Sequence, residues 1–243
     1  MPAVIETDAL SKTYKGPRGG VKALVDLTMD VQQGEIYGLV GPNGSGKTTT
    51  LKLLLGLLYP TKGHAKLFGK DPLLDSGVKQ RLGFLPEGPY FYDHLDAVEV
   101  LSLYAQLFRI PREEARKRIE RLLEQVGMTD RRHVRLAQCS KGMVQRIGLA
   151  QALINDPDLV LLDEPTSGLD PLGARDIRNA IIALREQGKT VFLCSHLLSE
   201  VERMCDRVAI VHQGRLLDVL RVNELSGPLE DRFVELVEEA ERH

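Results

Sequence analysis

The sequence predicts an α/β fold with a mainly parallel core sheet. Two apolar runs of strand length, at 36–40 and 159–162, stand on either side of a stretch with helical periodicity at 88–155. The first run is followed by 41–48, which fits G-x-x-x-x-G-K-[ST], and then by a helical pattern. A buried strand, a glycine-rich loop and a helix in that order are the context that a phosphate-binding loop requires.

Strands and helices can be assigned along the chain from the spacing of apolar residues. Strands are predicted at 4–14, 21–31, 36–40, 65–68, 82–86, 159–162, 190–194, 208–211 and 215–217. Helices are predicted at 49–59, 96–108, 111–126, 197–204 and near the C-terminus, with turns at 16–20 and 212–214. Pro111 is expected in the first turn of its helix, and Gly127 at the end of the same helix. The apolar face of the helix at 96–108 is predicted to consist of Val100, Leu101, Tyr104, Leu107 and Phe108.

These elements divide a single domain over 1–243 into a core and an insertion. The core covers 1–87 and 156–225 and includes an N-terminal antiparallel β region. Residues 88–155 are predicted to form an inserted helical subdomain, and 226–243 a short C-terminal helix.

Composition excludes several classes of protein. The net charge of -2 offers no overall attraction to nucleic acid or to an anionic membrane, so no nucleic-acid partner is expected. No apolar run reaches the roughly 20 residues of a membrane-spanning helix. The first residues lack the basic and then apolar pattern of a signal peptide. Cys139, Cys194 and Cys205 form no C-x-x-C pair, which favours reduced thiols in a cytoplasmic protein.

The segment 41–48 predicts where nucleotide phosphates bind. Its glycines let the backbone N–H groups turn inward toward phosphate oxygens, and the following helix directs its positive end at the same place. Lys47 is expected to reach the β- and γ-phosphates, and Thr48 to hold Mg²⁺. A glycine-rich turn that fits the motif by chance is the alternative, which the flanking strand and helix disfavour. The predicted nucleotide contacts of this region are Gly41, Pro42, Asn43, Gly44, Ser45, Gly46, Lys47, Thr48 and Thr49.

Two acids end the apolar run at 159–162 and predict a catalytic centre. Ligands of open parallel sheets bind at the carboxyl edge of the strands, where these carboxylates are expected to emerge. Asp163 is placed to hold Mg²⁺, directly or through water, and Glu164 to polarise an attacking water. The alternative is a strand end followed by a solvated acidic turn.

Three further residues have more than one interpretation. His196 follows a predicted strand and can reach a γ-phosphate or its attacking water, although spacing alone equally fits a capping role. Tyr14 ends the first strand and can stack on a base or serve as an ordinary strand-end aromatic. Cys194 suggests a Cys/His nucleophile with His196, which we disfavour because a cysteine in a buried strand is usually part of the core.

The segment at 139–146, Cys-Ser-Lys-Gly-Met-Val-Gln-Arg, makes the chain resemble the nucleotide-binding subunit of an ABC transporter. The order of motifs carries this resemblance. It identifies 41–48 as the Walker A motif and 159–164 as the Walker B motif with the catalytic glutamate. It further identifies 167–170 as the D-loop, with Asp170 at the nucleotide, and His196 as the switch histidine.

Two departures from the family pattern resemble bacterial ABC-2-type exporter ATPases. The signature L-S-G-G-Q keeps Ser140 and Gly142, whereas Lys141 and Met143 replace a glycine and a glutamine. A polar contact from position 143 is therefore in doubt. Glu87 stands where the family has a glutamine that senses Mg²⁺ and contacts the permease, and its carboxylate can still ligate a hard cation.

The resemblance implies an ATPase with ATP and Mg²⁺ as cofactors. It implies a head-to-tail homodimer, or a pair with another ATPase subunit, in which each Walker A site is completed by Ser140 and Gly142 of the other subunit. Tyr14 would stack on adenine. The remaining partner would be an integral-membrane permease, which would hold the protein on the cytoplasmic face of the cell membrane. Export is favoured, and an importer subunit is the alternative.

Two other functions fit the sequence less well. A soluble ABC ATPase acting on nucleic acid or ribosomes would carry coiled-coil insertions or two ATPase halves, and 243 residues with one set of motifs provide neither. A small-molecule kinase would need an acceptor site and a lid, and would leave Ser140 unexplained.

Aromatic residues are concentrated where the permease is expected to dock. Half of the twelve aromatics fall between 84 and 108, three of them in the loop that holds Tyr90, Phe91 and Tyr92. Aromatics are enriched at protein interfaces. We therefore expect at least one of these three side chains in the interface. The resemblance further implies a hydrophobic groove near 87–104, because this region of the family receives a short cytoplasmic helix of the permease beside the position of Glu87.

Overall fold

The computed structural model describes residues 3–16 and 19–242, so Pro17 and Arg18 of the predicted turn lie outside the described residues. The larger sheet consists of β3 (Ile36–Val40), β5 (Leu82–Leu85), β6 (Leu159–Asp163), β7 (Thr190–Ser195), β8 (Arg207–His212) and β9 (Arg215–Arg221). Their order is β5-β6-β7-β3-β8-β9, and β9 forms an antiparallel hairpin with β8 while the others run parallel. The predicted α/β fold with a mainly parallel core sheet is confirmed.

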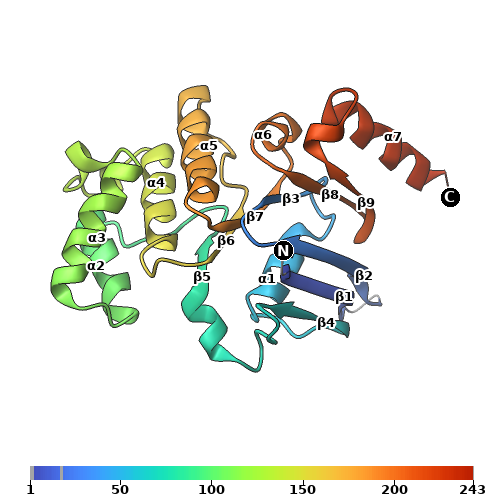
Figure 1. Cartoon of the computed structure of the whole chain (residues 1–243), viewed down its shortest axis with the longest axis horizontal. Helices are drawn as coiled ribbons and strands as arrows, with labels where there is room; N and C mark the ends of the chain where they lie inside the picture. Colours follow the sequence, from blue (N-terminus) through green and yellow to red (C-terminus); the bar gives the residue numbers. More distant parts are fainter. Residues whose placement is uncertain (1–2, 17–18, 243) are drawn as a thin grey trace.

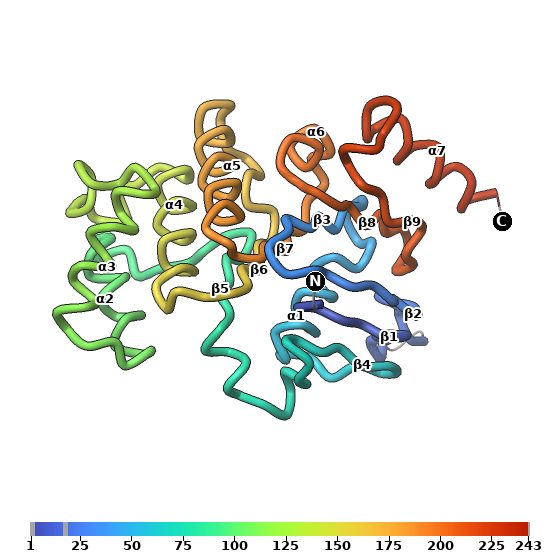
Figure 2. Tube along the Cα trace, in the orientation of Figure 1, coloured from blue at the N-terminus to red at the C-terminus, as the bar shows by residue number. Residues whose placement is uncertain are grey.

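A second sheet is antiparallel and uses β1 (Ala3–Tyr14), β2 (Val21–Gln32) and β4 (Lys62–Leu67), in the order β2-β1-β4. Figure 2 shows β4 beside β1, although β2 and β3 lie between them in the sequence. The N-terminal antiparallel region expected from the sequence is therefore present, with β4 as its third strand.

The helices are α1 (Lys47–Leu54), α2 (Ala97–Leu107), α3 (Arg112–Gln125), α4 (Lys141–Ala152), α5 (Pro171–Glu186), α6 (Leu198–Glu202) and α7 (Leu229–Glu241). Asp96 begins α2 with a capping box, in which its carboxylate accepts from the Glu99 backbone N–H at 2.8 Å and the Glu99 carboxylate accepts from the Asp96 N–H at 2.9 Å. Gly127 ends α3 with a φ of 66°. Within residues 3–16 and 19–242, none of the helices combines the length and hydropathy of a membrane span.

Three local predictions are wrong in detail. The helix predicted at 49–59 is shorter, because Gly56 turns the chain with a φ of 65° and packs closely on the carbonyl of Pro72. Pro111 precedes the first residue of α3 and is not part of its first turn. Leu107 is 68% exposed, so it does not belong to the buried face of α2.

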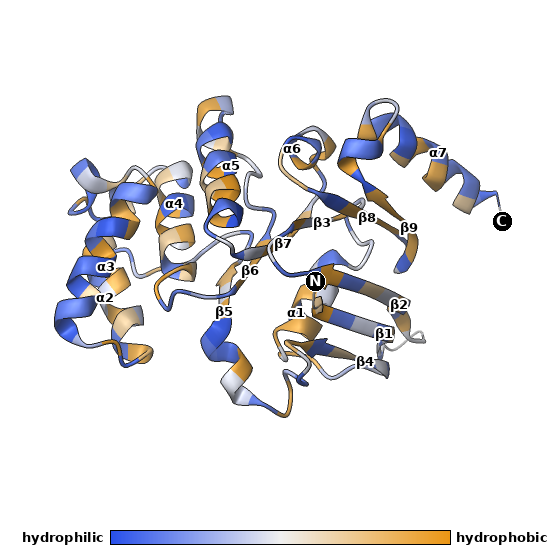
Figure 3. Cartoon of the chain, in the orientation of Figure 1, coloured by the Kyte–Doolittle hydropathy of each residue, from blue (hydrophilic) through white to orange (hydrophobic). Residues whose placement is uncertain are grey.

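Two hydrophobic cores cover the two faces of the larger sheet. Side chains alternate along β3, so that Ile36 and Val40 join one core while Tyr37 and Leu39 join the other. In Figure 1 the smaller sheet and α1 lie below the larger sheet, α5, α6 and α7 lie above it, and α2 to α4 extend beyond its β5 end. Figure 3 shows hydrophilic residues along α3 and hydrophobic ones on α1, which is enclosed between the sheets.

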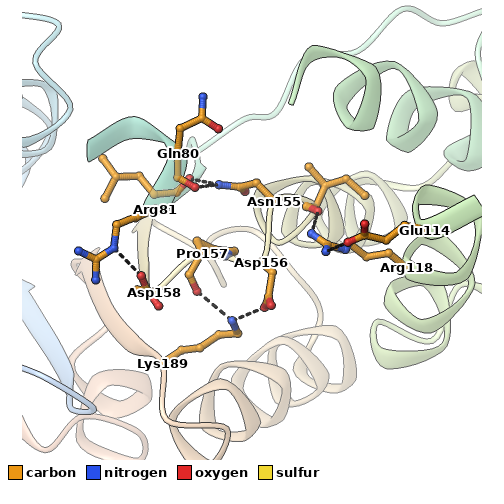
Figure 4. A network of polar contacts seen from close by, with 11 residues as sticks. Gln80, Arg81, Glu114, Arg118, Asn155, Asp156, Pro157, Asp158 and Lys189 are labelled. Atoms are coloured by element: carbon orange, nitrogen blue, oxygen red, sulfur yellow. Dashed lines mark hydrogen bonds and ion pairs between the residues drawn. The ribbon is translucent and has the colours of Figure 1, made fainter. Parts of the chain in front are cut away.

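The connection from α4 to β6 is held by side chains of neighbouring elements. Asn155 donates through Nδ2 to the carbonyls of Gln80 and Leu82, at 2.9 Å each, and Lys189 pairs with Asp156 at 2.6 Å (Figure 4). These contacts join the end of the helical region to the sheet, so they fix where β6 enters it.

Candidate nucleotide site

The carboxyl ends of three parallel strands meet at one edge of the larger sheet. Val40, the last residue of β3, pairs with Ser195 in β7, and Asp163, the last residue of β6, pairs with Cys194. The glycine-rich loop after β3, the acids of β6 and His196 after β7 are therefore brought together. Ligands of open α/β sheets bind at this edge.

Lys47, the first residue of α1, lies at the centre of the loop. Its buried ammonium donates to the carbonyl of Gly41 at 2.7 Å and to that of Pro42 at 3.3 Å. The same nitrogen is 3.5 Å from Oε1 of Glu164. A phosphate bound in the loop would meet this cation together with the positive end of α1.

The loop needs glycine at two positions because other backbone approaches it closely. A Cβ added at Gly41 would lie 2.2 Å from the carbonyl oxygen of Val211. Gly46 has a φ of 106°, and a Cβ there would lie 2.5 Å from the carbonyl oxygen of Ala23. The close approach of β8 and β2 thus requires glycine at these two positions, and the loop is closed by the Ser45 N–H, which donates to the Pro42 carbonyl at 3.1 Å.

Thr48 and Asp163 lie together in a way that fits a divalent cation. Thr48 Oγ1 donates to Asp163 Oδ2 at 3.3 Å, and Asp163 is only 5% exposed. Its Oδ1 and the Oγ of Ser45 are buried without a hydrogen-bond partner among residues 3–16 and 19–242. Burial raises the pKa of Asp163, against the hydrogen bond from Thr48, and the charges of Glu164 and Glu87 raise it further. Mg²⁺ would favour the ionised carboxylate and use its free oxygen.

Asp163→Asn is expected to stabilise the nucleotide-free protein at neutral pH. Because the folded-state pKa of Asp163 is raised, wild-type stability falls as pH rises from the unfolded to the folded pKa. The amide does not ionise, so we expect a melting temperature higher by roughly a few degrees at neutral pH. This gain should disappear as pH falls through the raised pKa of Asp163.

Thermal melts from neutral pH down through the raised pKa of Asp163, with and without Mg²⁺ and ATP, would check the prediction. Mg²⁺ with ATP should stabilise the wild type more than Asp163→Asn. Asp93→Asn, at an exposed position, is the control and should leave the melting temperature unchanged. An unchanged or lower value for Asp163→Asn at neutral pH would contradict it.

Glu164 is buried and held in a strained conformation. Its φ of 49° lies in the left-handed region, which costs a residue other than glycine about 1–2 kcal/mol. Its N–H donates to the Cys194 carbonyl at 2.9 Å. Its Oε2 accepts from the His196 N–H at 3.2 Å and lies 2.9 Å from His196 Nδ1. The carboxylate is therefore fixed between Lys47 and His196, an arrangement suited to a general base.

Tyr14 and Glu87 lie at the border of the site. The Tyr14 hydroxyl is 3.4 Å from Thr49 Oγ1 in the first turn of α1, and its ring is 38% exposed. A base could stack there without displacing core residues. Glu87 is exposed just after β5, and its charge contributes to the raised pKa of Asp163.

Among residues 3–16 and 19–242, neither Ser140 nor Gly142 has a described contact with the loop at 41–48. Ser140 is exposed at the start of α4, where its Oγ accepts from the Met143 N–H at 3.3 Å. A Cβ at Gly142 would meet Leu169 at an ordinary 3.8 Å, so no contact described within this chain demands glycine there. Asp170 caps α5 by accepting from the N–H of Gly173 at 2.7 Å.

Two buried polar groups lie beside the site, the thiol of Cys194 and the amide of Gln145. Burial raises the pKa of the Cys194 thiol well above its ordinary value, which agrees with a core role and not with a nucleophile. Gln145 was missed. It donates to the carbonyl of Pro165, directly after Glu164, at 3.0 Å. The sequence offers only its position within the helical region predicted at 88–155 as a signal for it.

The sequence is similar to ABC transporter ATP-binding proteins of several bacteria. The family model described as ABC transporter matches residues 24–167. An uncharacterised ABC transporter ATP-binding protein of Nostoc sp. is 49% identical over 231 residues, which are 93% of this chain and 69% of the relative. The bacitracin transport ATP-binding protein BcrA of Bacillus licheniformis is 40% identical over 93% of this chain and 72% of the relative. The fluoroquinolones export ATP-binding protein of Mycobacterium tuberculosis is 39% identical over 88% of this chain and 70% of the relative.

Solved structures share the fold. A dimeric ATP-binding cassette in a post-hydrolysis state, with ADP and Pi bound, has a TM-score of 0.83 and 27% identity. The match covers 91% of this chain and all of the other.

Proposed function

This chain belongs to the ABC transporter family, and we propose that it is the ATP-hydrolysing subunit that powers a separate membrane permease. The convergence of Lys47, Glu164 and His196 at the carboxyl edge of the sheet carries this proposal. Export is favoured because relatives are named for bacitracin transport and fluoroquinolone export.

The geometry supports a hydrolysis mechanism through this chain's own residues. Glu164 accepts a proton from water as the water oxygen attacks the γ-phosphorus and the bond to the β-phosphate oxygen breaks. His196 orients the Glu164 carboxylate through its backbone N–H and Nδ1. Lys47 neutralises charge on the β- and γ-phosphates. Thr48 and Asp163, with Glu87 nearby, would hold Mg²⁺, which supplies further neutralisation of the phosphate oxygens.

A second subunit would complete each site. Ser140 is exposed at an N-terminal helix end, and Gly142 leaves room for the close approach of a ligand. Since neither has a described contact with its own loop, we propose that they contact nucleotide on the other subunit of a homodimer or a paired subunit. ATP bound between the subunits would hold them together, and hydrolysis would release them.

An apolar groove supports the permease partner and a place on the cytoplasmic face of the membrane. The groove has a volume of about 510 Å³ and lies between the β5 end and α2, with Leu57, Tyr90 and Leu107 among its lining residues. Tyr90 is 86% exposed. Phe91 instead packs edge-on against Tyr104, with ring centroids 6.4 Å apart, so it also serves the core.

Replacing Tyr90 and Leu107 together by alanine is expected to weaken permease binding by about tenfold or more, because exposed aromatics at interfaces are frequent hot spots. Co-purification with the membrane partner and transport in cells would measure this. ATP binding by the isolated protein should not change.

Leu74→Ala is the matched control, since Leu74 is as exposed as Tyr90 but lies outside the groove. Normal co-purification and transport in the double variant would place the docking surface elsewhere.

A further inference from the structure

Gln145 is a buried polar side chain that the mechanism above does not use. It lies in α4, five residues after Ser140, and is 2% exposed. Its Nε2 donates to the carbonyl of Pro165 at 3.0 Å. A buried amide needs a hydrogen-bond partner, which here is the carbonyl of Pro165, the residue after Glu164.

The turn that begins at Glu164 depends on its neighbours for its shape. Glu164 has a φ of 49°, and the following proline further restricts the conformations it can adopt. Such a conformation persists only where surrounding contacts determine it. The backbone of Glu164 bonds to Cys194 and Ser167. The next carbonyl, that of Pro165, accepts its hydrogen bond from the Gln145 side chain.

The start of α4 also contacts the segment that follows the turn. The Lys141 ammonium lies over Gly168, where an added Cβ would come within 2.3 Å of Nζ. Gly142 faces Leu169, as described above. Helix α4 and the segment at 165–169 thus lie close together from Lys141 to Gln145, and the hydrogen bond of Gln145 joins them. A displacement of Ser140 would be transmitted to the turn that carries Glu164.

We propose that Gln145 is a positioning residue for ATP hydrolysis, which holds the Glu164 turn and couples it to the signature end of α4. This rests on the proposed ATPase function. Engagement of Ser140 with a nucleotide on the second subunit would then set the position of Glu164 in its own subunit, so that the two sites of a dimer are linked.

Gln145→Met removes the donor and keeps the length of the side chain. We expect kcat of the full-length protein to fall roughly 10- to 100-fold, because small misplacements of a catalytic group have effects of this size. KM and the affinity for ATP should stay within about twofold of wild type, since the phosphate loop is not touched. Steady-state ATPase assays and calorimetric titration with ATP would separate the two quantities.

Gln145→Glu provides a second readout with a pH dependence. A protonated carboxyl can donate to the Pro165 carbonyl, whereas an ionised one cannot. The kcat of Gln145→Glu relative to wild type should therefore rise as pH is lowered, and the same ratio for Gln145→Met should not.

Asn155→Leu is the matched control, because it removes another amide that donates to backbone carbonyls, away from Glu164 (Figure 4). It should lower the melting temperature and leave kcat per folded protein unchanged. Wild-type kcat in Gln145→Met, or a flat pH ratio in Gln145→Glu, would overturn the inference while leaving the ATPase assignment intact. A wild-type protein without ATPase activity would instead overturn the proposed function.

Discussion

Glu164→Gln is expected to lower ATP turnover by about 10² or more while ATP still binds. The amide keeps the shape of the buried side chain and can still accept from the His196 backbone N–H, so the turn should remain intact. It is a far weaker proton acceptor than the carboxylate, so the attacking water is no longer activated. Since bound ATP is no longer consumed, the ATP-bound dimer should accumulate.

Single-turnover and steady-state ATPase assays would measure the loss, and light scattering after size exclusion would detect the dimer. Glu200→Gln is the matched control, because Glu200 is a similarly shielded acid that pairs with Arg178 at 2.7 Å, outside the site. It should retain wild-type turnover. Wild-type turnover in Glu164→Gln would refute the role of Glu164 as the general base. If the variant stays monomeric at high protein and ATP concentrations, crosslinking in the assembled complex would show whether the dimer forms only with the permease.

Lys47→Ala is expected to remove most nucleotide affinity and, with it, hydrolysis. The Lys47 ammonium is already buried at the centre of the loop, so its contacts to phosphate would be shielded from water. A hydrogen bond to a charged group contributes about 1.5–3 kcal/mol, so losing one or two of them corresponds to about 10- to 10⁴-fold in affinity. Removing the cation also leaves the neighbouring Glu164 carboxylate uncompensated, which opposes an entering phosphate further.

Titration with ATP and with a fluorescent ATP analogue would test this result, with the melting temperature as a check on folding. Lys52→Ala serves as control, since Lys52 is an exposed lysine on the same helix. Unchanged affinity and turnover in Lys47→Ala would contradict the assignment of 41–48 as the phosphate-binding loop.

Local signals were sufficient wherever a short stretch of chain determines its own structure. The apolar runs at 36–40 and 159–162 became buried strands, and Gly127 ended its helix with a positive φ. The hairpin of β8 and β9 formed around the predicted turn. The loop at 41–48 could be recognised from its sequence because the spacing of its glycines, Lys47 and Thr48 fits the motif, whereas the close approach of β8 and β2 to Gly41 and Gly46 is a tertiary contact.

Contacts between distant segments decided the rest. Sequence could not show that Gly56 meets Pro72, which shortens the helix at that end, or that Leu107 faces outward. Gln145 could not be distinguished from an ordinary helical residue by its sequence. Its hydrogen-bond partner is in the turn that follows β6, which only the fold brings next to α4.

The family of the fold, the strand–loop–helix unit and the residue types able to bind phosphate and activate water could all be predicted from the sequence. That Lys47, Glu164 and His196 meet could not be predicted, since it depends on the parallel register that aligns the ends of β3, β6 and β7. The fold also leaves Ser140 exposed at the start of α4. The physical reason is that hydrophobic periodicity reports which face of an element is buried, whereas register and packing against other elements decide which side chains come together.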